Sequence, residues 1–350
     1  MTVVPLYTAA CRQASDKETA MANYAAITGW GMAVPERVLT NDDLSRMVDT
    51  SDEWIRTRTG IRERHVVGPN ESTSTLATEA GHRAIERAGI APQAIDMIVL
   101  ATCTPDRPFP ATACTVQANL GIPTASAFDV AAACSGFVYG LGVATSMIKS
   151  GMACNVLFIA ADVFTHYINW HDRNTCVLFG DGAGAVVLQP SDEPLGLLSC
   201  VMGASGADED LMAVDVGGTR QPATPELLEQ GRQYVYMHGG EIFKLAVRGM
   251  SDSSLQALEQ AHVSIDNVSV VVPHQANLRI IAATAKRLDV PMERFFVNID
   301  KYGNTSAASV PIALVEAVES GRIKDGDNVL LTSFGGGLTW ASSVIRWGRP

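Results

Sequence analysis

Three side chains that could take part in catalysis lie far apart in the sequence: the thiol of Cys134, the imidazole of His274 and the amide of Asn304. Cys134 follows the apolar run 127–130, which reads as a strand, and three alanines. A cysteine where a strand turns into a helix lies near the free N–H groups of the first helical turn, and these favour the thiolate. We therefore predict that Cys134 is a nucleophile with a lowered pKa. The alternative is a buried structural cysteine, which is common for a free thiol.

The stretch that Cys134 opens is apolar or small on every side. Val138, Leu141, Thr145 and Ile148 recur at helical spacing, and the opposite face is also apolar or small. A helix without a polar face is a buried helix. We therefore expect Cys134 at the start of a helix inside the protein.

Other segments are typical of an α/β fold. The apolar runs 95–102 and 155–160 predict buried parallel strands, and 72–89 predicts an amphipathic helix. The glycine cluster 180–184 lacks a following Lys-Ser/Thr, so we interpret it as a tight turn between two strands rather than a phosphate loop. Residues 190–225 are rich in Pro, Gly and Asp and are predicted to form a surface connection rather than core.

Landmarks of the first half of the chain return in the second. Gln-Ala-Asn-Leu occurs at 117–120 and at 275–278, and Asn-Val-Leu opens a predicted strand at 155 and at 328. The order and spacing favour a duplication over generic α/β patterning. We predict two similar α/β halves, 21–195 and 196–350, after an N-terminal extension at 1–20 that is expected to be flexible.

The duplication bears on the three chemical side chains. Paired landmarks are offset by near 170 residues, which matches Asn304 to Cys134. His274 ends the predicted strand 268–272. If the halves pack about a pseudo-twofold axis, we expect all three side chains to face one centre.

Composition limits the classes of partner. The chain has 350 residues and a net charge of −11, so it is a poor general binder of nucleic acid. No apolar run is long enough to span a bilayer, and 1–20 lacks the features of a secretion signal. The seven cysteines contain no C-x-x-C, which argues against a disulfide framework or a zinc site. We expect a cytoplasmic protein without a metal or a membrane partner.

A dense cationic stretch interrupts this acidic chain. Arginines at 56, 58, 62 and 64 follow Trp54 closely. The stretch is either a solvated helix end with local ion pairs or an anion site in which Trp54 offers a flat stacking surface.

Cys134 in AAACSGFVYGL, His274 in VPHQANLRI and Asn304 in YGNTSAASVPIAL together resemble the β-ketoacyl-acyl-carrier-protein synthase III family. The segments DTSDEWIRTRTGIRERH, FGDGAGAVVL and SFGGGLTW resemble the same family, in the same order over 21–350. The resemblance implies an α/β thiolase-like fold, internally duplicated, with αβαβα layers, buried central helices and a homodimeric state. It implies a decarboxylating condensation of an acyl-CoA primer with malonyl-acyl-carrier protein that initiates fatty-acid synthesis. It implies no cofactor.

The residue chemistry suits such a reaction. Cys134 would hold the primer as a thioester, and His274 and Asn304 would donate hydrogen bonds to the thioester oxygen that becomes negative during decarboxylation. By resemblance, the backbone N–H groups of Cys134 and Gly336 would form the oxyanion hole for primer loading.

The resemblance also assigns binding residues. Those for coenzyme A or substrate are Trp54, Arg58, Thr59, Arg173, Asn277 and Phe243, and Phe109 would reach across the dimer to border the acyl pocket. Arg279 matches the arginine that binds the carrier protein. Lys286 and Arg287 share its helix face, and Lys244 and Arg248 share a face on another helix, so we expect these cations to dock the acidic carrier. The alternative is a solvated helix face.

Two other functions remain alternatives. A condensing enzyme or acyltransferase of secondary metabolism would use the same fold on other substrates. A non-catalytic acyl-binding subunit is disfavoured because the nucleophile and both donors are present, and a thiolase because Asn304 stands where a second acid/base thiol would be wanted. Primer length depends on packing inside the acyl pocket and is left open by the sequence.

Overall fold

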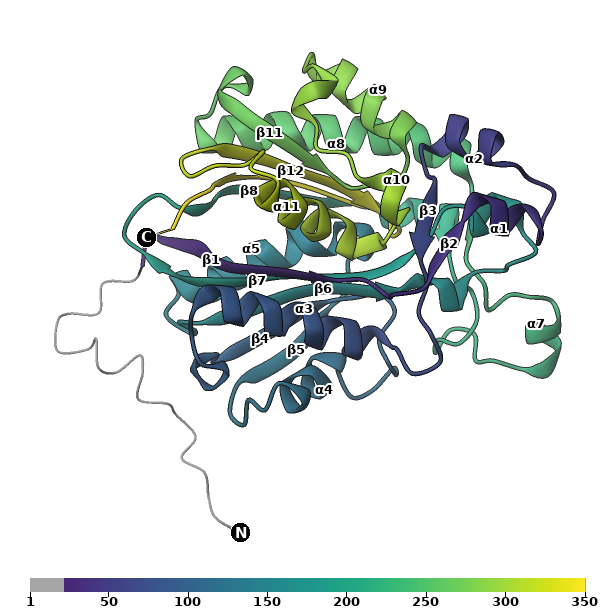
Figure 1. Ribbon diagram of the computed structural model, residues 1–350, viewed down its shortest axis with the longest axis horizontal. Helices are drawn as coiled ribbons and strands as arrows, with labels where there is room; N and C mark the ends of the chain where they lie inside the picture. The colour runs from purple at the N-terminus through teal and green to yellow at the C-terminus, as the bar shows by residue number, and fades with distance from the viewer. Residues whose placement is uncertain (1–21, 350) are drawn as a thin grey trace, which may run out of the picture.

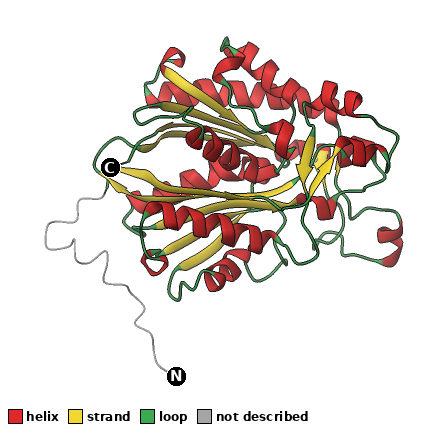
Figure 2. Ribbon diagram, viewed as in Figure 1, coloured by secondary structure: helices red, strands yellow, loops and turns green. Residues whose placement is uncertain are grey.

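The computed structural model describes residues 22–349, and the predicted extension at 1–20 lies outside them. Nine strands form one sheet in the order β11-β12-β13-β8-β1-β7-β6-β4-β5. Figures 1 and 2 show helices both between and outside the two parts of this sheet. The strands are β1 (Tyr24–Ala33), β4 (Met97–Ala101), β5 (Ser126–Val130), β6 (Val156–Val163), β7 (Asp181–Ser191), β8 (Gly196–Ala204), β11 (Val268–Pro273), β12 (Asn328–Gly335) and β13 (Thr339–Arg346).

Six helices make up the layers against this sheet. They are α3 (Thr73–Ala88), α4 (Thr112–Asn119), α5 (Gly136–Lys149), α8 (Gly239–Ala261), α9 (Leu278–Leu288) and α11 (Ser309–Glu319). The smaller elements are α1 (Asn41–Ser45), α2 (Asp52–Thr59), α6 (Arg173–Cys176), α7 (Pro225–Glu229), α10 (Ile299–Tyr302) and the strands β2 (Val38–Thr40), β3 (Glu63–His65), β9 (Met212–Ala213) and β10 (Tyr236–Met237). Figure 1 shows α1, α2, α7, β2 and β3 at one end of the molecule.

The layers follow from which faces are apolar. The buried helices α5 and α11 pack together between the two parts of the sheet, where Phe137 and Leu314 belong to one core with Phe158 and Leu331. The opposite face of the β4–β7 part is covered by α3 and α4, and that of the β11–β13 part by α8 and α9. The resulting order of layers is α–β–α–β–α, as the resemblance implied. The predicted buried helix after Cys134 is α5, preceded by one 3-10 turn, Ala133–Ser135.

The sheet consists of two parts with corresponding strand orders, five strands in the first and four in the second. We call β1, β4, β5, β6 and β7 with α3, α4 and α5 the first repeat, and β8, β11, β12 and β13 with α8, α9 and α11 the second repeat. The first repeat runs β1-β7-β6-β4-β5 and the second runs β8-β13-β12-β11, and the two meet where Ala25 of β1 pairs with Gly196 of β8.

The register gives the correspondence between the repeats. Met97 pairs with Val156, and Val270 pairs with Val329, so the offset is 173 residues (from 97 to 270 and from 156 to 329). The 3-10 turns Ala133–Ser135 and Ser306–Ala308 keep this offset, and each begins at a residue of positive φ. Cys134 therefore corresponds to Ala307, and our match of Cys134 with Asn304 is wrong. The backbone turn fixes the equivalence, whereas the sequence comparison paired the polar side chains.

The glycine cluster 180–184 is a second correction. It forms no turn between two strands, because β7 runs unbroken from Asp181 to Ser191 and α6 precedes it. A Cβ on Gly184 would lie 2.6 Å from Cβ of Pro311, and one on Gly182 would lie 2.8 Å from Cδ1 of Ile312. The glycines therefore allow α11 to approach the sheet closely, which is a packing role.

The segment 190–225 also differs from the prediction. Gly196–Ala204 is β8, which pairs with β13 and joins the repeats through β1. This strand contains Gly and Ser residues and is only half-buried, so its sequence lacks the continuous apolar pattern of a buried strand. Among residues 22–349, no helix has both the length and the apolar character needed to span a bilayer.

Candidate active site

One cavity of about 640 Å³ contains all three predicted catalytic side chains. Cys134, His274 and Asn304 line it together although they lie in three separate segments of the chain. Cys134 comes from the turn before α5, His274 directly follows β11, and Asn304 precedes the turn before α11. The expected convergence of a thiol, an imidazole and an amide is therefore present in the fold.

Cys134 is 3% exposed, and its Sγ lies 3.6 Å from Oγ of Ser306. Burial raises the pKa of the thiol to about 12, and the contact with Ser306 opposes only part of that rise. The sequence predicted the opposite direction from the position of Cys134 before a helix. The prediction is wrong because it did not include the loss of solvation in a closed cavity.

The backbone of Cys134 is pressed against a glycine. A Cβ on Gly335, at the end of β12, would lie 2.6 Å from the backbone nitrogen of Cys134. A Cβ on Gly336 would meet nothing closer than 3.6 Å. Gly335, rather than Gly336, is therefore the residue whose missing side chain admits Cys134.

His274 is buried and fixed on both its backbone and its ring. Its N–H donates to the carbonyl of Thr332 at 2.8 Å, and its Nδ1 lies 2.6 Å from Oγ of Ser309. Burial lowers the pKa of the imidazole to about 3. The ring is therefore neutral at physiological pH and carries one N–H.

Asn304 is held by three hydrogen bonds. Its N–H donates to the carbonyl of Leu178 at 2.8 Å, and its carbonyl accepts from Gly180 at 3.0 Å. Its Oδ1 accepts from the backbone N–H of Ser306 at 2.9 Å. Because the amide oxygen is engaged, the NH₂ group is the end that remains to donate into the cavity.

Asp162 is a buried carboxylate behind these residues that the sequence analysis missed. Its Oδ1 accepts hydrogen bonds from the Thr102 hydroxyl at 3.0 Å and the Cys103 backbone at 2.9 Å, and its Oδ2 accepts from the N–H of Ala307 at 3.0 Å. It ties β6 of the first repeat to the turn that follows Asn304. The available signal was an acid within an otherwise apolar strand.

Seven predicted binding residues, from α2, α8 and the start of α9, also line the cavity. They are Trp54, Arg58, Thr59, Phe243, Lys244, Asn277 and Arg279. The guanidinium of Arg58 lies 4.6 Å from the ring centroid of Trp54. Arg173 does not line the cavity, but its guanidinium lies 5.0 Å from the same ring. An aromatic face and two cations thus meet at Trp54, which lines the cavity.

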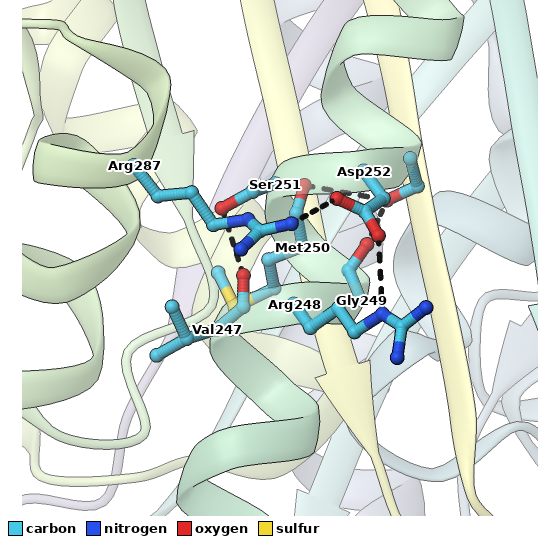
Figure 3. A network of polar contacts seen from close by, with 8 residues as sticks. Val247, Arg248, Gly249, Met250, Ser251, Asp252 and Arg287 are labelled. Carbon is cyan, nitrogen blue, oxygen red and sulfur yellow. Dashed lines mark hydrogen bonds and ion pairs between the residues drawn. The ribbon is translucent and has the colours of Figure 1, made fainter.

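The other predicted residues lie outside the cavity lining. Phe109 is 85% exposed. Arg248 and Arg287, from α8 and α9, share one carboxylate (Figure 3): Oδ1 of Asp252 accepts from Arg287 at 2.8 Å and Oδ2 accepts from Arg248 at 3.4 Å. Lys286 and Gly336 are also absent from the lining. In the part of the chain that the structure describes, no cluster of side chains could hold a metal ion.

A duplicated sheet around buried helices, with a thiol and two neutral donors in one cavity, defines a thiolase-like condensing enzyme. Two family models match the chain: 3-oxoacyl-[acyl-carrier-protein] synthase III at residues 128–206 and its C-terminal counterpart at 258–347. A beta-ketoacyl-[acyl-carrier-protein] synthase III from Roseiflexus sp. (strain RS-1) is 75% identical over 327 residues, which cover 93% of this chain and 99% of the relative. The chain belongs to the β-ketoacyl-acyl-carrier-protein synthase III family.

Solved structures agree with this assignment. The 3-oxoacyl-[acyl-carrier-protein] synthase III from Aquifex aeolicus VF5 is 49% identical with a TM-score of 0.86, and the match covers 92% of this chain and 100% of that one. A priming β-ketosynthase from the R1128 polyketide biosynthetic pathway is 34% identical with a TM-score of 0.88, covering 95% of this chain and 99% of that one. The thiolase-like fold predicted from the sequence is confirmed.

Proposed function

We propose that this chain condenses an acyl-CoA primer with malonyl-acyl-carrier protein, with loss of CO₂, and so starts fatty-acid synthesis in the cytoplasm without a cofactor. The observation that carries the proposal is the meeting of Cys134, His274 and Asn304 in one cavity. Each residue supplies a different part of the chemistry.

In the loading step, the sulfur of Cys134 attacks the thioester carbon of the acyl-CoA and loses its proton. A tetrahedral oxyanion forms, and the backbone N–H groups of Cys134 and Gly336 stabilise it. The intermediate collapses by breaking the bond to the sulfur of coenzyme A, which leaves and takes up a proton. Because burial raises the pKa of Cys134, the resting thiol keeps its proton until a substrate is bound.

In the condensation step, the C–C bond to the malonyl carboxylate breaks and CO₂ leaves. The electron pair moves toward the thioester oxygen, where the His274 ring and the Asn304 amide donate hydrogen bonds. Both donors are neutral, so neither forms a stable ion pair with the substrate before the charge develops. The resulting enolate carbon attacks the acyl group on Cys134, and the thiolate leaves and regains a proton.

Coenzyme A would enter through the outer end of the cavity. Trp54 offers a ring for the adenine, while Arg58 and Arg173, both against that ring, supply positive charge for phosphates. Thr59, Phe243 and Asn277 line the same cavity as Cys134, so the pantetheine arm would contact them. Oδ1 of Asn277 caps α9 by accepting from the N–H of Arg279 at 2.8 Å, which leaves the NH₂ group for the pantetheine arm.

We further propose that the carrier protein docks over α8 and α9. Arg279 and Lys244 line the cavity, so they form the part of the docking surface nearest to the entering arm. Lys286 extends it along α9. Arg248 and Arg287 belong to the proposed surface as well, but they share Asp252 and so present less net charge to a partner.

A homodimer fits the edge of the sheet. β5 is the last strand at its end of the sheet, and its residues 127–130 are only half-buried. A row of free strand groups favours pairing with a second copy. Phe109, which is 85% exposed, would then find cover in the partner, as the family resemblance implies.

The test is a primer panel read by intact mass. Acetyl-, branched and longer acyl-CoA should each be offered to the full chain, and the mass increase assigned to the peptide that contains Cys134. Cys134→Ala is expected to show no acyl adduct with any primer, and malonyl-carrier protein should discharge the adduct of the unmodified chain. An undiminished adduct in Cys134→Ala would refute the proposed intermediate.

A further inference from the structure

Ser309, the first residue of α11, contacts the catalytic imidazole from behind. Its Oγ lies 2.6 Å from Nδ1 of His274, and it also accepts a hydrogen bond from the backbone N–H of Gln275 at 3.3 Å. Within residues 22–349 these are the two hydrogen-bond partners of that hydroxyl. Ser309 is 2% exposed, so no solvent replaces them.

The two contacts allow only one satisfied arrangement. A serine hydroxyl has one proton to donate and can accept through its oxygen. If Nδ1 carried the imidazole proton, the oxygen would accept from both Nδ1 and Gln275, and the hydroxyl proton would be buried without an acceptor, which costs free energy. If Ser309 donates to Nδ1, the hydroxyl proton, Nδ1 and the Gln275 N–H are all paired.

We propose that Ser309 selects the tautomer of His274 that carries its proton on Nε2, and is thereby a positioning residue for malonyl decarboxylation. This inference rests on the proposed function. A neutral imidazole with its proton on Nδ1 would turn a lone pair toward the cavity and repel the enolate oxygen. With Nδ1 occupied by Ser309, the Nε2–H is the group that faces the cavity.

The arrangement parallels the one at Asn304. There the Ser306 N–H occupies the amide oxygen and leaves the NH₂ group to donate. Both donors of the proposed decarboxylation site thus have their accepting atom engaged by the turn before α11 or by its first residue.

The first experiment reads the tautomer directly. The full chain is labelled with ¹⁵N-histidine, and the ring signals of His274 are identified by their loss in His274→Asn. We expect a protonated Nε2 and an unprotonated Nδ1 in the unsubstituted chain. In Ser309→Ala the proton should redistribute toward Nδ1, whereas Ser309→Thr, which keeps the hydroxyl, should retain the original tautomer. A protonated Nδ1 in the unsubstituted chain overturns the proposal.

The second experiment separates the two chemical steps. Ser309→Ala should slow malonyl decarboxylation by the acyl-enzyme by roughly tenfold or more, while loading of Cys134 changes by less than about threefold. Ser343→Ala is the matched control, because it removes a buried hydroxyl that has no hydrogen-bond partner in the described chain. Parallel losses in both steps, with unchanged ring signals, would show a merely structural serine and overturn the proposal. An unsubstituted chain that forms no acyl-Cys134 would refute the proposed function instead, and the ring signals would still decide the tautomer.

Discussion

Asp162 and Ala307 join the two repeats through one hydrogen bond: Oδ2 of the aspartate accepts the backbone N–H of Ala307 at 3.0 Å. At the offset of 173 residues, Ala307 is the counterpart of Cys134 and Gly335 is the counterpart of Asp162. The first repeat therefore has a carboxylate at this position, and that carboxylate accepts a hydrogen bond from the turn before α11. The second repeat has a glycine at the equivalent position, so the turn that carries Cys134 contacts Gly335 and finds no side-chain acceptor there.

Replacing Asp162 tests the hydrogen bond between this carboxylate and the backbone of Ala307. In Asp162→Asn an NH₂ group replaces one accepting oxygen and faces a donor, either Ala307 N–H or the cluster around Thr102. We expect a loss of about 1–3 kcal/mol in the free energy of unfolding, measured by urea denaturation. Malonyl decarboxylation should fall more than primer loading, because the turn after Asn304 is the part that loosens.

Asp129→Asn provides the comparison for Asp162. Its carboxylate accepts from the N–H groups of Thr112 and Ala113, at the start of α4 within the first repeat and outside the cavity. This variant should lose stability without changing the ratio of the two steps. The same change of ratio in both variants would argue against a specific role for Asp162.

Adding a methyl group at Gly335 tests the close contact between this glycine and the backbone of Cys134. A Cβ there would lie 2.6 Å from the nitrogen of Cys134 and 3.1 Å from its Cβ, so Cys134 must move. Loading should slow by about 100-fold or more, which is the usual loss when an oxyanion donor is displaced. Gly206→Ala, where an added Cβ meets nothing within 4 Å, controls for the substitution itself. Normal loading in Gly335→Ala would mean that the backbone of Cys134 is not a donor.

The pKa of Cys134 makes a prediction about alkylation. With a pKa near 12, only a small fraction of the thiol is ionised at neutral pH, and that fraction grows about tenfold per pH unit. The rate of iodoacetamide labelling of the Cys134 peptide should therefore keep rising from pH 6 to 9, followed by peptide mass spectrometry. The exposed Cys114 serves as an internal reference for the reagent. A plateau below pH 8 would restore the lowered pKa that the sequence suggested.

His274 makes a prediction about stability. Its pKa of about 3 in the folded chain lies below the unfolded value of 6.5, so below pH 6.5 the unfolded state binds more protons. The contribution of this ring to the free energy of unfolding is complete above pH 6.5. It is lost as the pH falls toward 3, by up to about 1.4 kcal/mol per pH unit. Urea denaturation should therefore give a lower free energy of unfolding at pH 5 than at pH 7. In His274→Asn this difference between the two pH values should be smaller by about 2 kcal/mol. Equal slopes in both proteins would contradict a buried neutral ring.

Reversing the charge at Arg279 tests carrier docking. Arg279→Glu should raise the KM for malonyl-carrier protein by about tenfold, because a local cation meets an acidic partner there, while acyl-CoA loading of Cys134 stays within about threefold. Arg248→Glu, whose side chain already faces Asp252, should have the smaller effect on KM. Equal loss of carrier use and of loading in Arg279→Glu would remove the docking role. Steady-state kinetics with both substrates separate these outcomes.

From the amino-acid sequence alone one could predict the family, the α/β layers, the buried helix after Cys134 and the three side chains that line one cavity together. These predictions rest on local patterns and motifs, since apolar periodicity is set over a few neighbouring residues. The prediction from sequence was wrong where one local pattern is compatible with two structures. Gly182 and Gly184 suit a turn, but they serve close packing of α11 on β7.

The pKa of Cys134, its correspondence with Ala307 and the contacts of Asp162, Ser309 and Gly335 are visible only in the folded chain. Each depends on groups that are distant in sequence: a closed cavity desolvates the thiol, and Asp162 reaches Ala307 across the boundary between the repeats. Burial and hydrogen-bond partners are properties of the packed chain, so no spacing of residue types could reveal them.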